Sequence, residues 1–356
     1  MQARLSRLAL VCVILFASLL GACSPGIGAN ATPQPIPRVG LMHVGTDHVP
    51  PSLGTLVGRL ADLGWIDGSH DELVARLVKD GHVEGPRIEL IWRNLTDKTA
   101  ADNQAAAFVA EHVNVIVAFE DKSIAAAQAA TAKMEHPIPV VFLHPSDPVR
   151  DGLVKSLSHP GGNLTGVFGA RDPVVRQLEL YQQIMPGLRR LLTLVDPTDK
   201  ATPVLRTEAE DAARGLGLEL DIAFASTAAD LERAFHSLTP GEVDGVFLLS
   251  PSLRLTFSKL TIKLATEAGL PVQSHRKEWV EQGALFSLGV DVGPVGYAGA
   301  RYVDSILRGT PPADLPVEEV PRIEFAINLA RAGELGIEVP DDVITRADVV
   351  YRYVKP

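Results

Sequence analysis

The chain has 356 residues, a formal net charge of −10 and two cysteines, Cys12 and Cys23. This acidic balance argues against nucleic acid as a partner, because proteins that bind phosphate backbones carry an excess of Lys and Arg. Both cysteines lie in or at the end of the leader predicted below, so after processing no thiol remains for a disulfide, a Cys-based metal cluster or a nucleophile.

The first residues have the layout of a secretory leader. Arg4 and Arg7 precede an uncharged run from Leu8 to Leu20, which is too short to span a bilayer. The run ends in Leu20-Gly21-Ala22-Cys23, which has the form of a lipobox. We therefore predict a lipoprotein signal peptide over residues 1–22 and lipidation of Cys23. The alternative is an ordinary secretory signal with an incidental cysteine.

A flexible tether is predicted over residues 23–37. Its sequence, CSPGIGANATPQPIP, is rich in Pro, Gly, Ala and Asn and lacks the apolar surface that folding requires. Ser24 after the cysteine favours the outer membrane in a host with two membranes. We expect an exported protein, anchored through Cys23 to a bacterial membrane and facing the periplasm or the cell exterior.

Beyond the tether, short apolar runs alternate with longer stretches of helical periodicity, which is typical of parallel sheets covered by helices. The predicted strands fall in two series. The first comprises Arg38–Met42, Ile88–Trp92, Val113–Ala118, Val140–Leu143 and Leu164–Phe168, and the second comprises Leu191–Val195, Leu218–Phe224, Gly245–Leu249, Pro271–Ser274 and Ala284–Leu288. About 320 mature residues exceed the size at which one core keeps growing, so two α/β units are expected.

Helices are predicted between these strands. They are Leu53–Leu63, Ala100–Glu111, Ser123–Lys133, Val174–Met185, Thr207–Leu216, Leu231–Leu238, Phe257–Ala268 and Val295–Leu307. Gly217, Gly269 and Gly309 stand where three of them end, as a left-handed cap requires.

The segment from Pro137 to Val167 is interpreted as the first crossing between the two units. Its Pro160-Gly161-Gly162-Asn163 is turn chemistry that leads into a strand. The alternative is an ordinary surface loop.

Several motifs occur in order along the chain. They are LGW at 63–65, VEGPRIELIWR at 83–93, DPV at 147–149, GLV at 152–154, SL at 156–157, PGGN at 160–163, TGV at 165–167, YVDSILRGTPPADLPVEEV at 302–320 and FAINLARAGELGIEVPDDVITRAD at 325–348. With these motifs the chain resembles the ABC transporter substrate-binding protein family that includes the tryptophan-transporter-like receptors. The resemblance covers nearly the whole mature chain.

The resemblance implies the α/β fold of a type I periplasmic binding protein. In that fold two Rossmann-like lobes, with parallel sheets flanked by helices, are joined by three crossing segments. The expected boundaries are residues 38–160 with 290–320 for lobe 1, and 161–289 with 321–356 for lobe 2. The resemblance also implies a ligand in the cleft between the lobes and an ABC permease as a partner.

Two features depart from the family pattern. Where the family has a Gly-Thr-Pro-type turn after the third strand, this chain has Phe119-Glu120-Asp121-Lys122-Ser123. A carboxylate ligand would meet two acidic side chains there, so we expect a small polar ligand with a positive or hydroxyl-rich part, with Lys122 as a counterweight. The second departure is an additional helix-like piece at Asp71–Lys79.

The candidate site residues lie in loops that follow predicted strands, because ligands of open α/β sheets bind beyond the carboxyl ends of the strands. They are Gly45, Thr46, Glu120, Asp121, Lys122, Ser123, Ser146 and Asp147 after strands of the first series, and Asp196, Ser250, Ser252, Arg276 and Asp291 after strands of the second. For each the alternative is turn or cap chemistry, with Asp121 and Ser123 as helix caps and Asp196 as the start of a turn.

A metal site is weighed and not predicted. His43, His48 and His144 with Glu120 and Asp147 form a conceivable ligand set, but no tight ligand spacing supports it. We interpret these histidines as structural.

Catalysis and a cofactor are not predicted either. The sequence has no Gly-x-Ser-x-Gly elbow, His-Glu-x-x-His pair, Walker loop or Rossmann glycine fingerprint. Ser250, His275 and Asp291 can be drawn as a triad, but any chain of this size allows one.

The leading hypothesis is a solute-binding lipoprotein that captures a small polar molecule in an interlobe cleft and delivers it to an ABC importer. One alternative is a sensory receptor of the same fold that signals to a membrane kinase or cyclase. The other is an enzyme, which predicts turnover of the bound compound.

Overall fold

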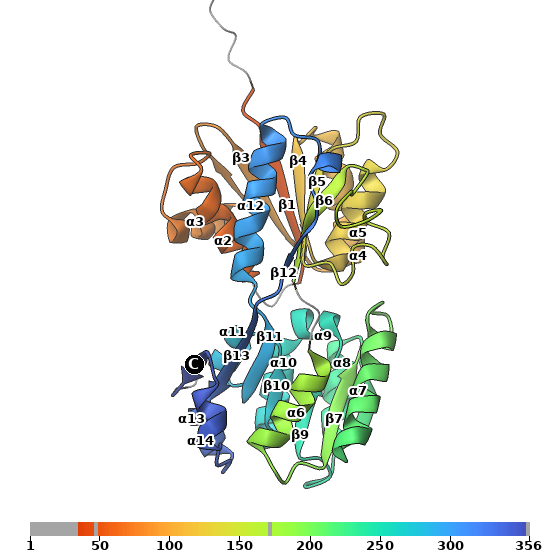
Figure 1. The fold of residues 1–356 in the computed structure, drawn as a ribbon, viewed down its shortest axis with the longest axis vertical. Helices are drawn as coiled ribbons and strands as arrows, with labels where there is room; N and C mark the ends of the chain where they lie inside the picture. Colours follow the sequence, from red (N-terminus) through yellow and green to blue (C-terminus); the bar gives the residue numbers. More distant parts are fainter. Residues whose placement is uncertain (1–34, 46–48, 170–172, 354–356) are drawn as a thin grey trace, which may run out of the picture. The chain divides into compact units, whose positions relative to one another are not determined.

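The computed structural model describes residues 35–45, 49–169 and 173–353. Its strands form two sheets flanked by helices (Figure 1). The first sheet contains β1 (Arg38–Val44), β2 (His82–Glu84), β3 (Glu89–Leu95), β4 (Val115–Phe119), β5 (Val140–Leu143), β6 (Leu164–Gly169) and β12 (Glu318–Val320). The second contains β7 (Arg190–Val195), β8 (Glu219–Phe224), β9 (Gly245–Leu248), β10 (Val272–Ser274), β11 (Phe286–Val290), β13 (Ile323–Asn328) and β14 (Val349–Tyr351).

The strand orders are those of doubly wound sheets. The first sheet runs β12-β6-β5-β4-β1-β3-β2 and the second runs β14-β13-β11-β10-β9-β7-β8. Paired strands are parallel except for β2 with β3 and β11 with β13. The predicted α/β fold with two lobes is therefore confirmed.

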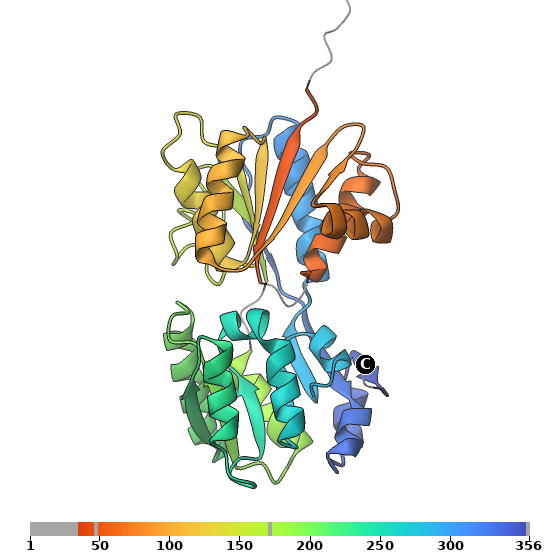
Figure 2. The same cartoon turned by 180° about the vertical axis from the view of Figure 1, so that it is seen from behind.

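Helices cover both faces of the first sheet (Figures 1 and 2). On one face α2 (Pro51–Asp62), α3 (His70–Asp80) and α12 (Gly293–Leu307) share a hydrophobic cluster with the strands. On the other face lie α4 (Lys98–Ala110) and α5 (Glu120–Thr131). A short 3-10 turn, η1 (Pro312–Asp314), precedes β12. We call this part of the chain the first lobe.

The second lobe has the same arrangement around the second sheet. Its longer helices are α6 (Val174–Ile184), α7 (Thr202–Leu216), α8 (Ala228–His236) and α10 (Ser258–Glu267). Its short helices are α9 (Pro251–Thr256), α11 (Lys277–Glu281), α13 (Leu329–Glu334) and α14 (Asp341–Thr345). Two hydrophobic clusters, one on each face, enclose the sheet.

The central strand β1 shows why the strands read as continuous apolar runs. Val39 and Leu41 belong to the cluster with α2 and α12, whereas Met42 and Val44 belong to the cluster with α4 and α5. All four side chains are buried. Because both faces of the strand are covered, neither face needs polar residues.

The sequence-based elements agree closely with the structure. All ten predicted strands and the additional helix at Asp71–Lys79, observed as α3, are present to within a few residues. Gly217, Gly269 and Gly309 each have a positive φ next to a helix end. The short strands β2, β12, β13 and β14 were not predicted.

One predicted boundary is wrong. Lobe 1 was expected to end at residue 160, but β6 pairs with β5 and β12 and thus lies in the first sheet. The turn at Pro160-Gly161-Gly162-Asn163 leads from one strand of the first sheet to the next. The chain changes sheets between β6 and α6, between β11 and α12, and between β12 and β13.

The predicted leader and its lipobox at Cys23 lie outside the described residues. No helix within residues 35–45, 49–169 and 173–353 is long and apolar enough to cross a membrane.

Candidate ligand-binding site

A cavity of about 560 Å³ lies where the strands of both lobes end. Its lining includes Glu120 after β4 and His144 after β5 from the first lobe, and Arg276 after β10 from the second. This volume is within the range of small-molecule sites in proteins. We call it the interlobe cavity.

The two lobes are linked in this cavity by an ion pair. Arg276 Nη2 donates to Glu120 Oε1 at 3.3 Å, and the two side chains are only 6% and 14% exposed. Burial raises the pKa of Glu120 to about 7, although the nearby Arg276 guanidinium opposes this shift. The cavity therefore contains a carboxyl group that titrates near neutral pH.

Glu120 also has an unusual backbone conformation. Its φ is +67°, and that of His144 is +61°, so both lie in the left-handed region that favours glycine. For a non-glycine residue this conformation costs about 1 kcal/mol or more, and such residues gather at functional sites. Both residues line the interlobe cavity at the ends of neighbouring strands.

Asp121 fixes the loop that follows β5. Its carboxylate accepts hydrogen bonds from Ser146 N at 2.8 Å and from Ser146 Oγ at 2.5 Å. Burial raises the pKa of Asp121, while the Ser146 hydrogen bonds counteract this effect. The alternative role of Asp121 as a helix cap does not apply, because the N-cap of α5 is Phe119 and no side chain caps this helix.

In the second lobe the Asp196 carboxylate connects three loops next to the interlobe cavity through hydrogen bonds. Its Oδ1 accepts from Thr198 N, Thr198 Oγ1 and Ser226 Oγ, and its Oδ2 accepts from Ser252 Oγ, all within 2.9 Å. Burial alone would raise the pKa of Asp196, but these hydrogen bonds hold it below its usual value. The turn interpretation of Asp196 thus agrees with the structure, and its carboxylate is engaged within the protein.

Ser250 and Asp199 complete this support. Ser250 Oγ accepts from Asp196 N at 2.8 Å and lies 2.6 Å from Thr202 Oγ1. Asp199 accepts from Ser252 N and Ala201 N at 2.9 and 3.0 Å. The starts of α7 and α9 are therefore tied together beside the cavity.

About half of the predicted site residues meet in the interlobe cavity. Its lining includes Glu120, Asp121, Lys122, Ser146, Ser252 and Arg276. Five other candidates, Gly45, Ser123, Asp147, Asp196 and Ser250, are not part of the lining. Thr46 lies outside the described residues.

The non-lining candidates have structural surroundings. Asp147 accepts from Val149 N and Arg150 N, which is turn chemistry. Ser123 is fully buried in α5, and its hydroxyl has no hydrogen-bond partner within the described part of the chain.

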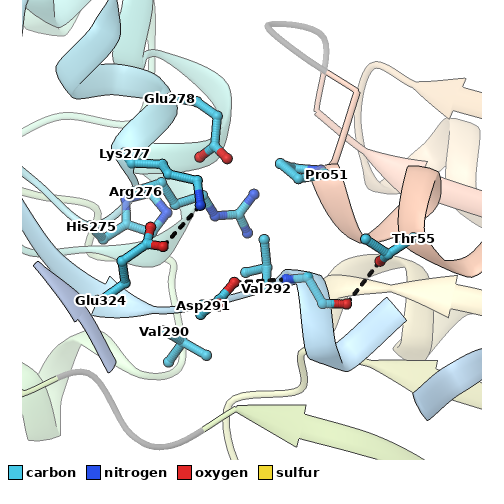
Figure 3. A pocket seen from close by; sticks show the side chains of 12 residues that line it. Pro51, Thr55, His275, Arg276, Lys277, Glu278, Val290, Asp291, Val292 and Glu324 are labelled. Carbon is cyan, nitrogen blue, oxygen red and sulfur yellow. Dashed lines mark hydrogen bonds and ion pairs between the residues drawn. The ribbon is translucent and has the colours of Figure 1, made fainter. Parts of the chain in front are cut away.

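Asp291 lies beside a second, smaller cavity of about 180 Å³ (Figure 3). Its Oδ1 accepts from Gly293 N at 3.1 Å, and its Oδ2 pairs with Arg322 at 3.2 Å. Gly293 O in turn accepts from Thr55 Oγ1 at 2.8 Å. Asp291 therefore anchors the chain where it passes from β11 into α12.

Sequence reasoning missed several charged lining residues. Among them are Lys98, Arg150, Asp199, Lys200 and Arg254. Lys98, Lys200 and Arg254 lie in or next to the short segments where helices begin. Their position at or near the start of a helix that follows a strand is the sequence feature that could have identified them as lining residues.

The histidines near the cavity are buried. Burial lowers the pKa of His43 to about 4, and burial together with Arg276 lowers that of His144 well below its usual value. His43 Nδ1 lies 3.0 Å from Asn94 Oδ1, and His144 Nε2 lies 3.0 Å from Ser52 Oγ. The described residues contain no group of three side chains that could hold a metal ion, and His48 lies outside them.

Known proteins resemble this chain in sequence and structure. The tyrosine-binding protein of Clostridioides difficile (strain R20291) is 27% identical over 232 residues. The match covers 65% of this chain and 66% of that protein, so this chain spans just under two thirds of the relative's length. A conserved domain protein from Vibrio cholerae is 28% identical, with a TM-score of 0.73 over 88% of this chain and 99% of that one. An ABC domain from Streptococcus pneumoniae, solved in complex with L-Trp, is 22% identical, with a TM-score of 0.74 and the same two coverages.

The architecture is that of a type I periplasmic binding protein, with two α/β lobes of mostly parallel strands. A family profile described as ABC transporter substrate binding protein matches residues 73–351. The chain therefore belongs to the ABC transporter substrate-binding protein family.

Proposed function

We propose that this protein is a solute receptor that captures one small polar molecule in the interlobe cavity and delivers it to an ABC importer. The observation that carries the proposal is the interlobe cavity itself, which has lining residues from both lobes and the Glu120–Arg276 ion pair inside it. A ligand placed there contacts both lobes and stabilises the form in which they close on it. Membership of the substrate-binding family supports the importer as the recipient.

The site residues that we assign to ligand binding are the polar and charged lining residues. From the first lobe these are Glu120, Asp121, Lys122 and Ser146, and from the second they are Ser252 and Arg276. Asp196 and Ser250 position Ser252 and the start of α7 through the hydrogen bonds described above. Removing them is expected to disturb the site indirectly.

The relatives bind tyrosine and L-Trp, which suggests a ligand the size of an amino acid. The cavity volume of about 560 Å³ accommodates such a molecule. The charged groups of Glu120 and Arg276 in the lining also favour a polar ligand, because an apolar ligand would remove them from water without new hydrogen bonds.

We further propose that the protein is exported and anchored to the membrane through a lipid on Cys23. The lipobox Leu20-Gly21-Ala22-Cys23 and the tether up to Pro37 support this assignment. Cys23→Ser should abolish labelling with radioactive palmitate and release the protein from the membrane fraction. Cys12→Ser, within the apolar run, is the matched control and should leave both unchanged. Unchanged labelling in Cys23→Ser would refute the anchor.

Two experiments test the transport function. Native mass spectrometry of the purified mature protein should detect one small molecule, and adding that molecule should raise the melting temperature because it binds only the folded form. A strain that lacks the gene should lose high-affinity uptake of the same compound. Unimpaired uptake, or conversion of the compound during long incubation with the protein, would contradict the proposal.

A further inference from the structure

The interlobe cavity has a surplus of positive charge. Its cationic lining residues are Lys98, Lys122, Arg150, Lys200, Arg254 and Arg276, and its acidic ones are Glu120, Asp121, Asp151 and Asp199. Among the described lining residues, six positive and four negative side chains leave a formal net charge of +2, whereas the whole chain carries −10. Lys98 is itself paired at 2.7 Å with Asp102, which is not part of the lining. The formal charge of this described lining thus has the opposite sign to that of the whole chain, which favours a negatively charged ligand.

The acidic side chains of the lining already have partners in the protein. Glu120 pairs with Arg276 at 3.3 Å, and Asp151 pairs with Arg150 at 3.0 Å. Asp121 accepts two hydrogen bonds from Ser146, and Asp199 accepts two from backbone N–H groups. A cationic ligand would have to compete with these contacts, so the acidic turn at Glu120 and Asp121 does not favour the ligand with a positive part that we expected from the sequence.

Two lysines of the lining are in the opposite situation. Lys122 lies in the first turn of α5 in the first lobe, and Lys200 lies just before α7 in the second. Both are exposed, and within the described residues neither forms an ion pair at 4.0 Å or less, although Lys122 lies close enough to Asp97 to help lower the pKa of that carboxyl group. Two like charges in one cavity repel each other, and a negative group bound between them would offset this repulsion.

The described lining residues do not include the aromatic side chains on which an aromatic ligand commonly stacks. No Phe, Tyr or Trp occurs among the described residues of the interlobe cavity. Residues 46–48 and 170–172, which the structure does not describe, are Thr-Asp-His and Ala-Arg-Asp in sequence. Aromatic ligands are commonly held by stacking on aromatic side chains, which contributes to affinity beyond the buried area.

We propose that the ligand is a small, non-aromatic oxyanion with a net negative charge, whose acidic group is held between Lys122 and Lys200. This inference rests on the proposed function, because it names the ligand class of the same cavity. Electrostatic attraction of this kind raises the rate of association and rejects ligands of the wrong charge.

The test is calorimetric titration of the purified mature protein at low ionic strength with a panel of probes. Citrate and L-glutamate represent carboxylates, and glycerol 3-phosphate represents phosphate esters. L-tyrosine, L-tryptophan, L-lysine and glucose represent the other classes. We expect an anionic probe to bind at least about tenfold more tightly than any of these four, and its affinity to fall as salt is added. The tighter of the carboxylate and phosphate arms identifies the acidic group.

Lys122→Gln and Lys200→Gln test the two lysines. Each should weaken the binding of the anionic probe by about three- to tenfold, and the double variant should weaken it further. Lys259→Gln, on the exposed face of α10 and outside the cavity, is the matched control and should bind like the wild type.

Tight binding of a neutral, zwitterionic or cationic probe with an affinity that neither lysine variant changes would overturn the inference and leave the receptor function intact. If the protein retains no small molecule and binds none of the probes, the receptor function and the inference both fall. An anionic probe whose binding responds to Lys122, Lys200 and salt supports both.

Discussion

Glu120 and Arg276 join the two lobes inside the interlobe cavity, with Arg276 Nη2 3.3 Å from Glu120 Oε1. Both side chains are largely withdrawn from water, and Glu120 holds its carboxylate there from a left-handed backbone. Because this ion pair has one member on each lobe, we expect the occupant of the cavity to influence how the lobes close. We expect a polar ligand to bind either by extending this pair or by replacing one of its members.

The raised pKa of Glu120 predicts a specific pH dependence of stability. Because the folded-state pKa is about 7 and the ordinary value is 4.5, the folded protein binds this proton more tightly than the unfolded chain. Ionisation of Glu120 therefore lowers stability as pH rises from about 4.5 to about 7, by at most about 3 kcal/mol, with little further change above. Denaturant unfolding at a series of pH values from 4.5 to 8 measures this loss of stability.

Glu120→Gln is the reference for this measurement, because it keeps the shape and removes the titration. The free energy of unfolding of the wild type minus that of the variant should fall across this window. His43 and His144, with lowered pKa values, produce a rise with pH, but they are present in both proteins. A difference that stays constant from pH 4.5 to 8 would show that the carboxyl is not buried as described.

The backbone of Glu120 gives a second prediction, which separates conformation from charge. Glu120→Ala and Glu120→Gly both remove the carboxylate, but only Gly adopts a φ of +67° without steric cost. We expect the Gly variant to be more stable than the Ala variant by about 1 kcal/mol in denaturant unfolding. Equal stabilities, or a more stable Ala variant, would mean that the left-handed conformation is not retained.

Close packing of α12 on α2 is tested at Gly296. A Cβ on this residue would lie 2.0 Å from Ser52 O and 2.3 Å from Thr55 Oγ1, so Gly296→Ala forces the two helices apart. We expect a loss of about 3 kcal/mol in the free energy of unfolding. Gly215→Ala, in α7 with open space around the new Cβ, should instead gain about 0.5–1 kcal/mol. If both variants shift stability alike, the helix contact is wrong.

Asp196 is predicted to be a structural residue of the second lobe. Asp196→Ala leaves the hydroxyls of Thr198, Ser226 and Ser252 without their common acceptor, and should cost about 3 kcal/mol of stability. Asp221→Ala, on the exposed edge of β8, should change stability by less than about 0.5 kcal/mol. Thermal and denaturant unfolding measure the stability of both variants. A loss of stability in Asp196→Ala as small as that in Asp221→Ala would show that Asp196 does not hold these loops together.

The strands were predictable because most of them are buried on both faces, so that each appears as an apolar run bounded by turn residues. The missed strand β12 begins with Glu318 and Glu319, and β13 contains Glu324, which interrupt that pattern. The boundary error at residue 160 has a different origin. Pro160-Gly161-Gly162-Asn163 specifies a turn, but turn chemistry does not say which sheet the next strand joins.

The location of the site could be predicted from the sequence, but the identity of the residues that line it could be predicted only in part. The rule that ligands bind beyond strand ends located Glu120 and Arg276, and the cavity contains both. The same rule included Asp196 and Ser250, whose side chains bind neighbouring loops instead. It omitted Lys200 and Arg254, which only the packing of α7 and α9 brings to the cavity. Strand order decides where a site lies, whereas tertiary contacts decide which side chains reach it.

The central claim is that one ligand occupies a cavity formed by both lobes. The most direct test fills that cavity with a large side chain from each lobe, by Ala125→Trp on α5 and by Val204→Trp on α7. Val175→Trp, on the exposed face of α6, is the control. Calorimetric titration of the ligand recovered from the wild type should show 1:1 binding that is lost in both cavity variants and kept in the control. Wild-type affinity in either cavity variant would contradict the claim.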